Sequence, residues 1–127
     1  MAIVSVSLNK TILQEIDHLQ HHLGYSGRSE IMRAGIRLLI QENKENETLT
    51  GDINAILLVI HTQDAENTVS SIKHRYEDVT NTQIHSHLKK NKCLELFIVE
   101  GDAARIKQMM GDFRTSRKMD LVKLLVP

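Results

Sequence analysis

Two histidines and the only cysteine of the chain lie close together in its second half. His85 and His87 alternate, so on a β-strand their side chains would point to the same face. The polar run KKNK at 89–92 predicts a tight turn, and a turn centred on Lys90 would bring Cys93 opposite His87. Imidazole nitrogens and a thiolate are common ligands of transition metal ions. The spacing therefore predicts a metal site formed by His85, His87 and Cys93.

Two further side chains are candidates for a role at this site. The same register would place Glu95 opposite His85, where its carboxylate could accept the imidazole N–H that does not face the metal. His61, at the end of an apolar stretch, is a candidate auxiliary metal ligand. A symmetry-related copy of the chain could supply a fourth donor. Because no general base is evident, we expect no catalytic residue and no enzymatic activity.

The alternation along the second strand of the hairpin also predicts its orientation. Leu94, Leu96 and Ile98 alternate with Cys93 and Glu95, so the two sets face opposite sides of a sheet. We expect helices to cover the three aliphatic residues. The metal ligands would then lie on the face without helices.

The elements around these residues predict a small α+β domain. The expected strands cover 53–61, 83–88, 93–100 and 119–126, and the expected helices cover 64–76 and 102–113. The order strand, helix, strand, strand, helix, strand is the βαββαβ ferredoxin-like arrangement, with a four-stranded antiparallel sheet and two helices on one face.

The first third of the chain predicts a different kind of unit. Residues 3–8 alternate as a short strand, 10–23 form an amphipathic helix that ends at Gly24, and 28–42 form a second helix. This second helix is apolar over most of its surface, and the strand has no partner nearby in sequence. Both features indicate an intertwined dimer formed by two copies of the chain.

The resulting domain organisation has three parts. Residues 1–45 form the N-terminal unit, the polar segment 46–52 is a linker, and residues 53–127 form the ferredoxin-like domain. The 127 residues carry 16 basic and 16 acidic side chains, so the chain is not a generally basic nucleic-acid binder. No segment predicts a membrane span or a signal peptide, which favours a cytoplasmic protein without a membrane partner.

Three motifs resemble the NikR-type nickel-responsive repressors: GYSGRSE at Gly24–Glu30, the hairpin IHSHLKKNKCLE at Ile84–Glu95, and EGD at Glu100–Asp102. The resemblance implies a ribbon-helix-helix DNA-binding dimer at the N-terminus, followed by an ACT-type domain that forms a homotetramer. It also implies Ni(II) as the metal, with Cu(II), Co(II) or Zn(II) as alternatives.

The resemblance assigns the metal ligands residue by residue. His85, His87 and Cys93 match the hairpin ligands of the family. His74 stands eleven positions before His85, at the spacing of the remaining family ligand. It would reach the metal of a neighbouring subunit in a square-planar site.

The same resemblance predicts residues that contact a double-stranded DNA operator. A two-stranded ribbon fits the major groove of B-DNA, and its outward residues would be Ile3, Ser5 and Ser7. The family usually has an arginine in place of Ile3. Arg28 and Ser29, at the start of the second helix, would contact phosphates together with free backbone N–H groups.

The sequence therefore predicts a metal-dependent, nickel-responsive transcriptional repressor. One alternative is a ribbon-helix-helix regulator whose ACT-like domain binds a small organic ligand. Another is a metal-binding protein without a DNA function.

Overall fold

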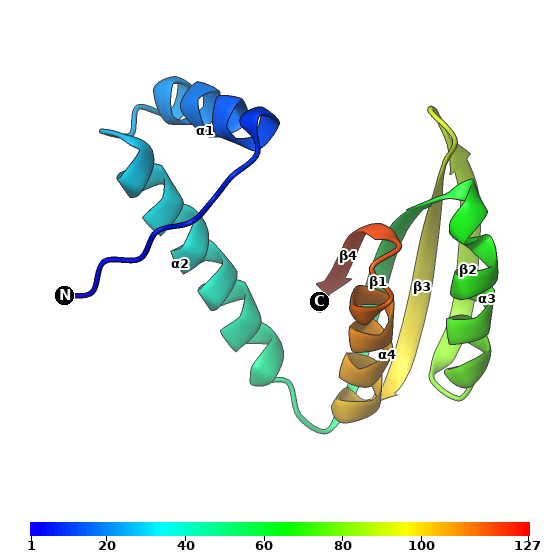
Figure 1. Ribbon diagram of the computed structural model, residues 1–127. Coiled ribbons are helices and arrows are strands. Elements are labelled where there is room, and N and C mark those ends of the chain that lie inside the picture. The colour runs from blue at the N-terminus through cyan, green and yellow to red at the C-terminus, as the bar shows by residue number, and fades with distance from the viewer. The chain divides into compact units, whose positions relative to one another are not determined.

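The computed structural model describes residues 1–127 as two compact units, Met1–Glu47 and Thr48–Pro127 (Figure 1). None of the helices combines the length and the apolar character that crossing a membrane would require.

The first helix of the N-terminal unit has the predicted bounds. It is α1, Lys10–Leu23. The side chain of Asn9 accepts a hydrogen bond from the main-chain N–H of Ile12 at 2.8 Å, which satisfies a free donor of the first turn. Gly24 ends the helix with φ 76°, in the left-handed region that glycine adopts without a steric penalty. Both ends of α1 are thus encoded locally.

The second helix, α2 (Arg28–Glu47), runs beyond the predicted end at residue 42. Side-chain pairs one turn apart link Gln41 to Glu45 and Asn43 to Glu47 across this extension, and such pairs stabilise a polar helix end. As a result, the segment between this helix and the first strand of the second unit covers only residues 48–51, which is shorter than the predicted linker at 46–52.

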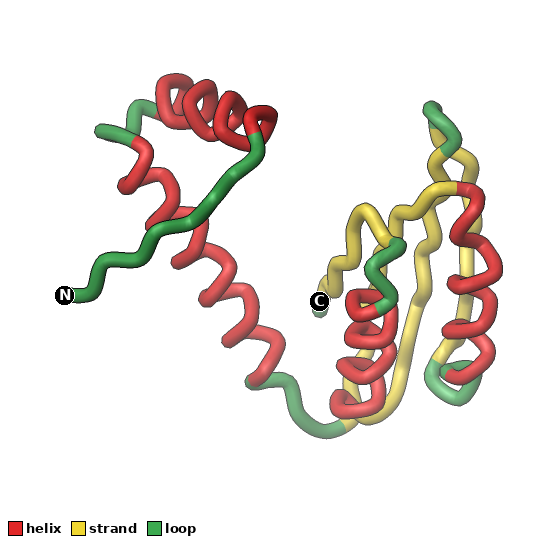
Figure 2. The backbone as a smooth tube through the Cα atoms, in the orientation of Figure 1, coloured by secondary structure: helices red, strands yellow, loops and turns green.

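Residues 1–9 contain no strand in the single chain, and they run as an extended loop (Figure 2). The strand expected at 3–8 needs a second chain to pair with, so it stays a prediction. The unit also lacks a core of its own: Ile31 is its only buried residue. Several large apolar side chains of both helices are exposed, among them Ile12, Leu19, Leu38 and Leu39.

The second unit has the predicted element order. Its strands are β1 (Asp52–Thr62), β2 (Thr80–Leu88), β3 (Lys92–Asp102) and β4 (Met119–Leu125). Its helices are α3 (Glu66–Arg75), preceded by a short 3-10 turn at Gln63–Ala65, and α4 (Ala103–Thr115). The four strands pair antiparallel in the order β2-β3-β1-β4. The α+β ferredoxin-like fold is confirmed.

Both helices cover one face of this sheet (Figure 1). The core between the sheet and the two helices combines strand residues with inward residues of α3 and α4. The ring centroids of Phe97 and Phe113 lie 5.7 Å apart within it. Its buried members are Ala55, Leu57, Val59, Val69, Ile72, Tyr76, Val79, Phe97, Val99, Ile106, Met109, Met110, Phe113 and Leu124. This core fixes which residues of β3 face the helices.

The expected orientation of the hairpin is wrong. Cys93 and Glu95 point to the helix-covered face together with Phe97, and they are 1% and 2% exposed. Leu96 and Ile98 lie on the opposite face and remain partly exposed. The prediction assigned Leu94, Leu96 and Ile98 to the core, whereas β3 contributes the alternate residues Phe97 and Val99 to it.

Candidate metal centre

A tight turn sets the register of the hairpin that carries the candidate ligands. Lys90 and Asn91 both have φ 60°, the left-handed conformation typical of short hairpin loops. The resulting pairs are His87 with Cys93 and His85 with Glu95. The four side chains therefore project from the same face of β2 and β3.

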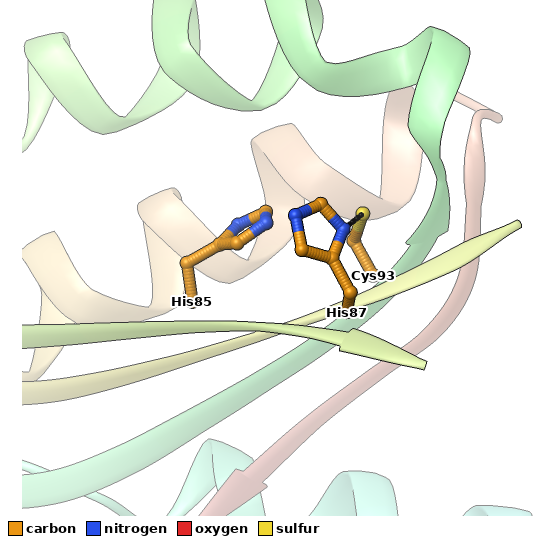
Figure 3. A group of neighbouring side chains, drawn as sticks. All are labelled: His85, His87 and Cys93. Atoms are coloured by element: carbon orange, nitrogen blue, oxygen red, sulfur yellow. Dashed lines mark hydrogen bonds between the residues drawn. The ribbon is translucent and has the colours of Figure 1, made fainter. Parts of the chain in front are cut away.

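The three predicted hairpin donors converge at this point. The donor atoms of His85, His87 and Cys93 all lie within 4.8 Å of one another (Figure 3). Cys93 Sγ is 3.7 Å from His87 Nδ1. Metal bonds of about 2.0–2.3 Å separate neighbouring donors of a planar site by about 3 Å and opposite donors by about 4 Å. The donors fit a transition metal ion after a movement of roughly an ångström or less.

The site is open on one side, because β2 is the edge strand of the sheet. Residues His85 and His87 are exposed although they share the helix-covered face, whereas Cys93 is buried. A metal held here would thus contact the protein on the Cys93 side and remain accessible to a further donor on the β2 side. Three donors from one chain leave room for that additional ligand.

Glu95 orients the first of these imidazoles. His85 Nδ1 donates to Glu95 Oε1 at 2.5 Å, and the amide of Gln83 approaches the other carboxylate oxygen at 3.4 Å. With the proton on Nδ1, the lone pair of His85 Nε2 is available to a metal. A carboxylate in this position also makes the imidazole a stronger donor. The structure thus places the Glu95 carboxylate against the free imidazole N–H of His85, as the sequence predicted.

His61 lies directly beside the thiol, a position that the sequence pattern could not show. It pairs with Cys93 across β1 and β3, so His61, Cys93 and His87 form one row across three strands. Its Nδ1 donates to the main-chain oxygen of Thr62 at 2.6 Å. Its Nε2 has no hydrogen-bond partner and faces Glu95 Oε1 at 3.5 Å, although the side chain is fully buried.

An orphaned acceptor of this kind is unfavourable unless something binds it. His61 is not one of the three convergent donors, but its backbone pairing with Cys93 puts this nitrogen in the same row of side chains. The buried nitrogen is thus a second observation, independent of the three clustered donors, that fits a positively charged occupant.

The surroundings of Cys93 favour the protonated thiol in the absence of metal. Burial raises the pKa of Cys93 above its ordinary value, and the negative charges of Glu66 and Glu95 raise it further. A thiolate is the form that binds metal. Metal binding at this site must therefore displace a proton from Cys93.

His74 lies apart from the other donors of its own chain. It is in the last turn of α3, its side chain is exposed, and its Nδ1 contacts Glu77 Oε1 at 2.7 Å. Glu66, whose charge acts on Cys93, is at the other end of the helix. Eight residues of helix separate the two by roughly 12 Å. His74 is thus not among the side chains whose donor atoms converge in this chain.

The residues predicted to contact DNA are all exposed in the N-terminal unit: Ile3, Ser5, Ser7, Arg28 and Ser29. Arg28 donates to both carboxylate oxygens of Asp17, at 2.8 and 2.9 Å, and thereby joins the start of α2 to α1. This ion pair holds the pKa of Asp17 below its ordinary value. The Arg28 N–H groups that donate to Asp17 are therefore not free to bind a phosphate unless this ion pair opens.

A family model and the sequences of known proteins both match this chain. Residues 55–126 match the family model described as the NikR C terminal nickel binding domain. A protein of Methanocaldococcus jannaschii that carries the name nickel-responsive regulator is 33% identical over 97% of this chain and 89% of its own length. A relative of the same name from Methanococcus maripaludis is 32% identical with the same coverage.

Two solved structures resemble the second unit in fold. One is an uncharacterized protein from Thermotoga maritima, with a TM-score of 0.56, 14% identity, and coverage of 60% of this chain and 98% of that one. The other is the ACT domain from GTP pyrophosphokinase of Chlorobium tepidum, with a TM-score of 0.51, 12% identity, and coverage of 59% and 100%. The family match over most of the second unit and the relatives that span nearly the whole chain agree: this chain belongs to the NikR family of nickel-responsive regulators.

Proposed function

We propose that this chain is a nickel-dependent DNA-binding repressor that takes up Ni(II) at His85, His87 and Cys93, with His74 of a second copy as the fourth donor. The observation that carries the proposal is the convergence of two imidazoles and a thiol from one hairpin, within 4.8 Å. A planar set of three nitrogens and one sulfur suits Ni(II) or Cu(II), whereas a tetrahedral arrangement would suit Zn(II).

Neighbouring side chains support this donor set. Glu95 keeps a proton on His85 Nδ1 and so directs Nε2 toward the metal. His61 is an auxiliary candidate that could replace one of these four donors, because its buried Nε2 makes no hydrogen bond and the residue lies in the same row as Cys93. When bound, nickel supplies a positive charge that joins groups from two chains. We expect no catalytic residue, because the four donors would be protein side chains that hold the metal without a vacancy for a substrate.

The outer face of the sheet supports assembly through the second unit. The face away from α3 and α4 carries several exposed aliphatic side chains: Ile84, Ile98, Leu121 and Leu125 are each between 38% and 53% exposed. Apolar patches of this kind mark contacts between proteins. We propose that copies of the chain cover this face in a homotetramer, which would also bring His74 to a neighbouring metal site.

The N-terminal unit supports a homodimer through residues 1–45. Its helices bury a single residue, and its extended segment 1–9 lacks a partner strand. Two copies would form the ribbon and cover the apolar residues of α2. Ile3, Ser5 and Ser7 would then face the major groove of operator DNA, while Arg28 and Ser29 would approach phosphates.

A DNA-binding assay with and without nickel tests this function. The promoter fragment of the chain's own gene serves as the probe, in fluorescence anisotropy at fixed salt. We expect tight binding only with nickel, and we expect His87→Ala to lose the nickel effect. Ser86→Ala is the matched control, since Ser86 lies between the two histidines on the other face of β2. Nickel stimulation that survives His87→Ala would contradict the proposed site.

A further inference from the structure

One arginine of α4 holds the end of α3. Arg105 Nη2 donates to the main-chain oxygen of Arg75, the last residue of α3, at 2.5 Å. Its Nε and Nη2 donate to the two carboxylate oxygens of Asp78 at 3.1 and 3.2 Å. Its guanidinium carbon lies 4.3 Å from the centre of the Tyr76 ring. A single side chain thus contacts three of the four residues that follow His74.

The last turn of α3 needs such a contact. The helix has ten residues, and helices of this length are unstable on their own. The residue that follows the helix, Tyr76, has φ −123°, so α3 lacks the left-handed glycine that often satisfies the last carbonyl groups. The guanidinium of Arg105 binds one of these carbonyls and places a positive charge at the negative end of the helix.

The aromatic ring between the two helices strengthens the same connection. Tyr76 is 2% exposed, and its hydroxyl donates to Asp112 of α4. Arg105 covers the ring from outside, in a cation–π contact. Its hydrogen bonds also hold the pKa of Asp78 below its ordinary value, in keeping with a bidentate ion pair. The residues around the end of α3 are therefore tied to α4 by several groups that act together.

His74 itself has little that fixes its position. Its side chain is 74% exposed, and Glu77 is the one residue that it contacts by a hydrogen bond or ion pair. The direction in which its imidazole points is thus set mainly by the backbone of the last helical turn. Whatever orders that turn also orders His74.

We propose that Arg105 is a positioning residue for the metal site: by fixing the end of α3, it holds His74 ready for the metal of a second copy. The proposal rests on the proposed function, and specifically on His74 as a nickel donor. Arg105 does not touch the metal. It lowers the conformational freedom that His74 must lose on binding, and this raises the affinity of a site on another chain.

The test is a nickel titration of the full-length protein against a competing chelator. We expect Arg105→Gln to weaken nickel binding by about 3- to 10-fold, less than the range of groups hydrogen-bonded to a metal ligand, because Arg105 acts only through the residues beside His74. Asp78→Asn, which leaves the guanidinium in place but removes its ionised partner, should weaken it in the same direction by less. Arg114→Gln is the matched control, because Arg114 is on the same helix and reaches only the main-chain oxygen of Val122, at 3.5 Å.

A double-mutant cycle with His74→Ala separates positioning from general stability. If Arg105 acts through His74, Arg105→Gln has no further effect on nickel affinity in the His74→Ala background, while its effect on the melting temperature persists. An equal loss of affinity in both backgrounds, or no loss in the wild-type background, would overturn the role of Arg105 alone. If His74→Ala leaves nickel affinity unchanged, the proposed donor is wrong and the role of Arg105 falls with it.

Discussion

Replacing Glu95 by glutamine should move nickel affinity and the stability of the metal-free protein in opposite directions. Glu95 Oε1 accepts from His85 Nδ1 at 2.5 Å and faces the unpartnered His61 Nε2 at 3.5 Å. In the variant, an amide nitrogen at this position can donate to both imidazoles. His85 would then carry its proton on Nε2, the nitrogen that the metal needs.

General magnitudes for contacts of these two kinds give the expected size of both effects. Loss of the carboxylate that orients His85 should weaken nickel binding about 10- to 100-fold, or roughly 1.4–2.7 kcal/mol. In the metal-free protein, a new hydrogen bond to buried His61 relieves an unsatisfied acceptor, which is worth about 1–3 kcal/mol. For a domain of this size, each kcal/mol raises the melting temperature by about 4–8 °C.

Two measurements check this prediction. Thermal unfolding in the presence of a chelator gives the stability of the metal-free protein, and competition titration gives the nickel affinity. Glu100→Gln is the control, because Glu100 is an exposed residue of the same strand that accepts from Asn81 and contacts no imidazole. A Glu95→Gln variant that binds nickel as tightly as the wild type, or that melts at a lower temperature, would refute the reasoning.

Three other changes have defined outcomes. Nickel affinity should rise about tenfold per pH unit above neutrality, because the pKa of Cys93 is raised and nickel binding must displace its proton. A dissociation constant that does not change with pH in nickel titrations would contradict this. Gly101→Ala should lower the free energy of unfolding, measured by chemical denaturation, by about 1–3 kcal/mol. Gly101 has φ +152°, and an added Cβ would lie 2.8 Å from Val79 Cγ1. Unchanged stability would contradict this steric argument. Ile98→Glu should reduce the assembly measured by sedimentation, because it places a charge on the outer face of the sheet, and an unchanged mass would place the contact elsewhere.

Features encoded by neighbouring residues could be predicted from the sequence. The ends of α1 follow from a capping asparagine and a left-handed glycine, which act within one turn. The pairing of His87 with Cys93 follows from the length of the turn between them. Both features depend on short-range geometry, so no knowledge of the rest of the fold was needed.

Features that depend on distant contacts could not be predicted. The hairpin orientation was wrong because alternation shows that two faces differ but not which one meets the helices. Phe97 and the residues of α4 decide that choice. His61 lies beside Cys93 only because β1 inserts next to β3, a pairing that local sequence does not specify. The strand predicted at 3–8 is absent from the single chain and stays a prediction, because it was expected to pair with a second copy.

The central claim is that a thiolate and imidazoles of one hairpin bind nickel together. The absorption spectrum of the protein titrated with nickel tests it most directly, with Cys93→Ser measured alongside. We predict a thiolate-to-nickel charge-transfer band that saturates as the site fills and is absent from the variant. A nickel-loaded wild type without such a band, or a variant that keeps it, would contradict ligation by Cys93.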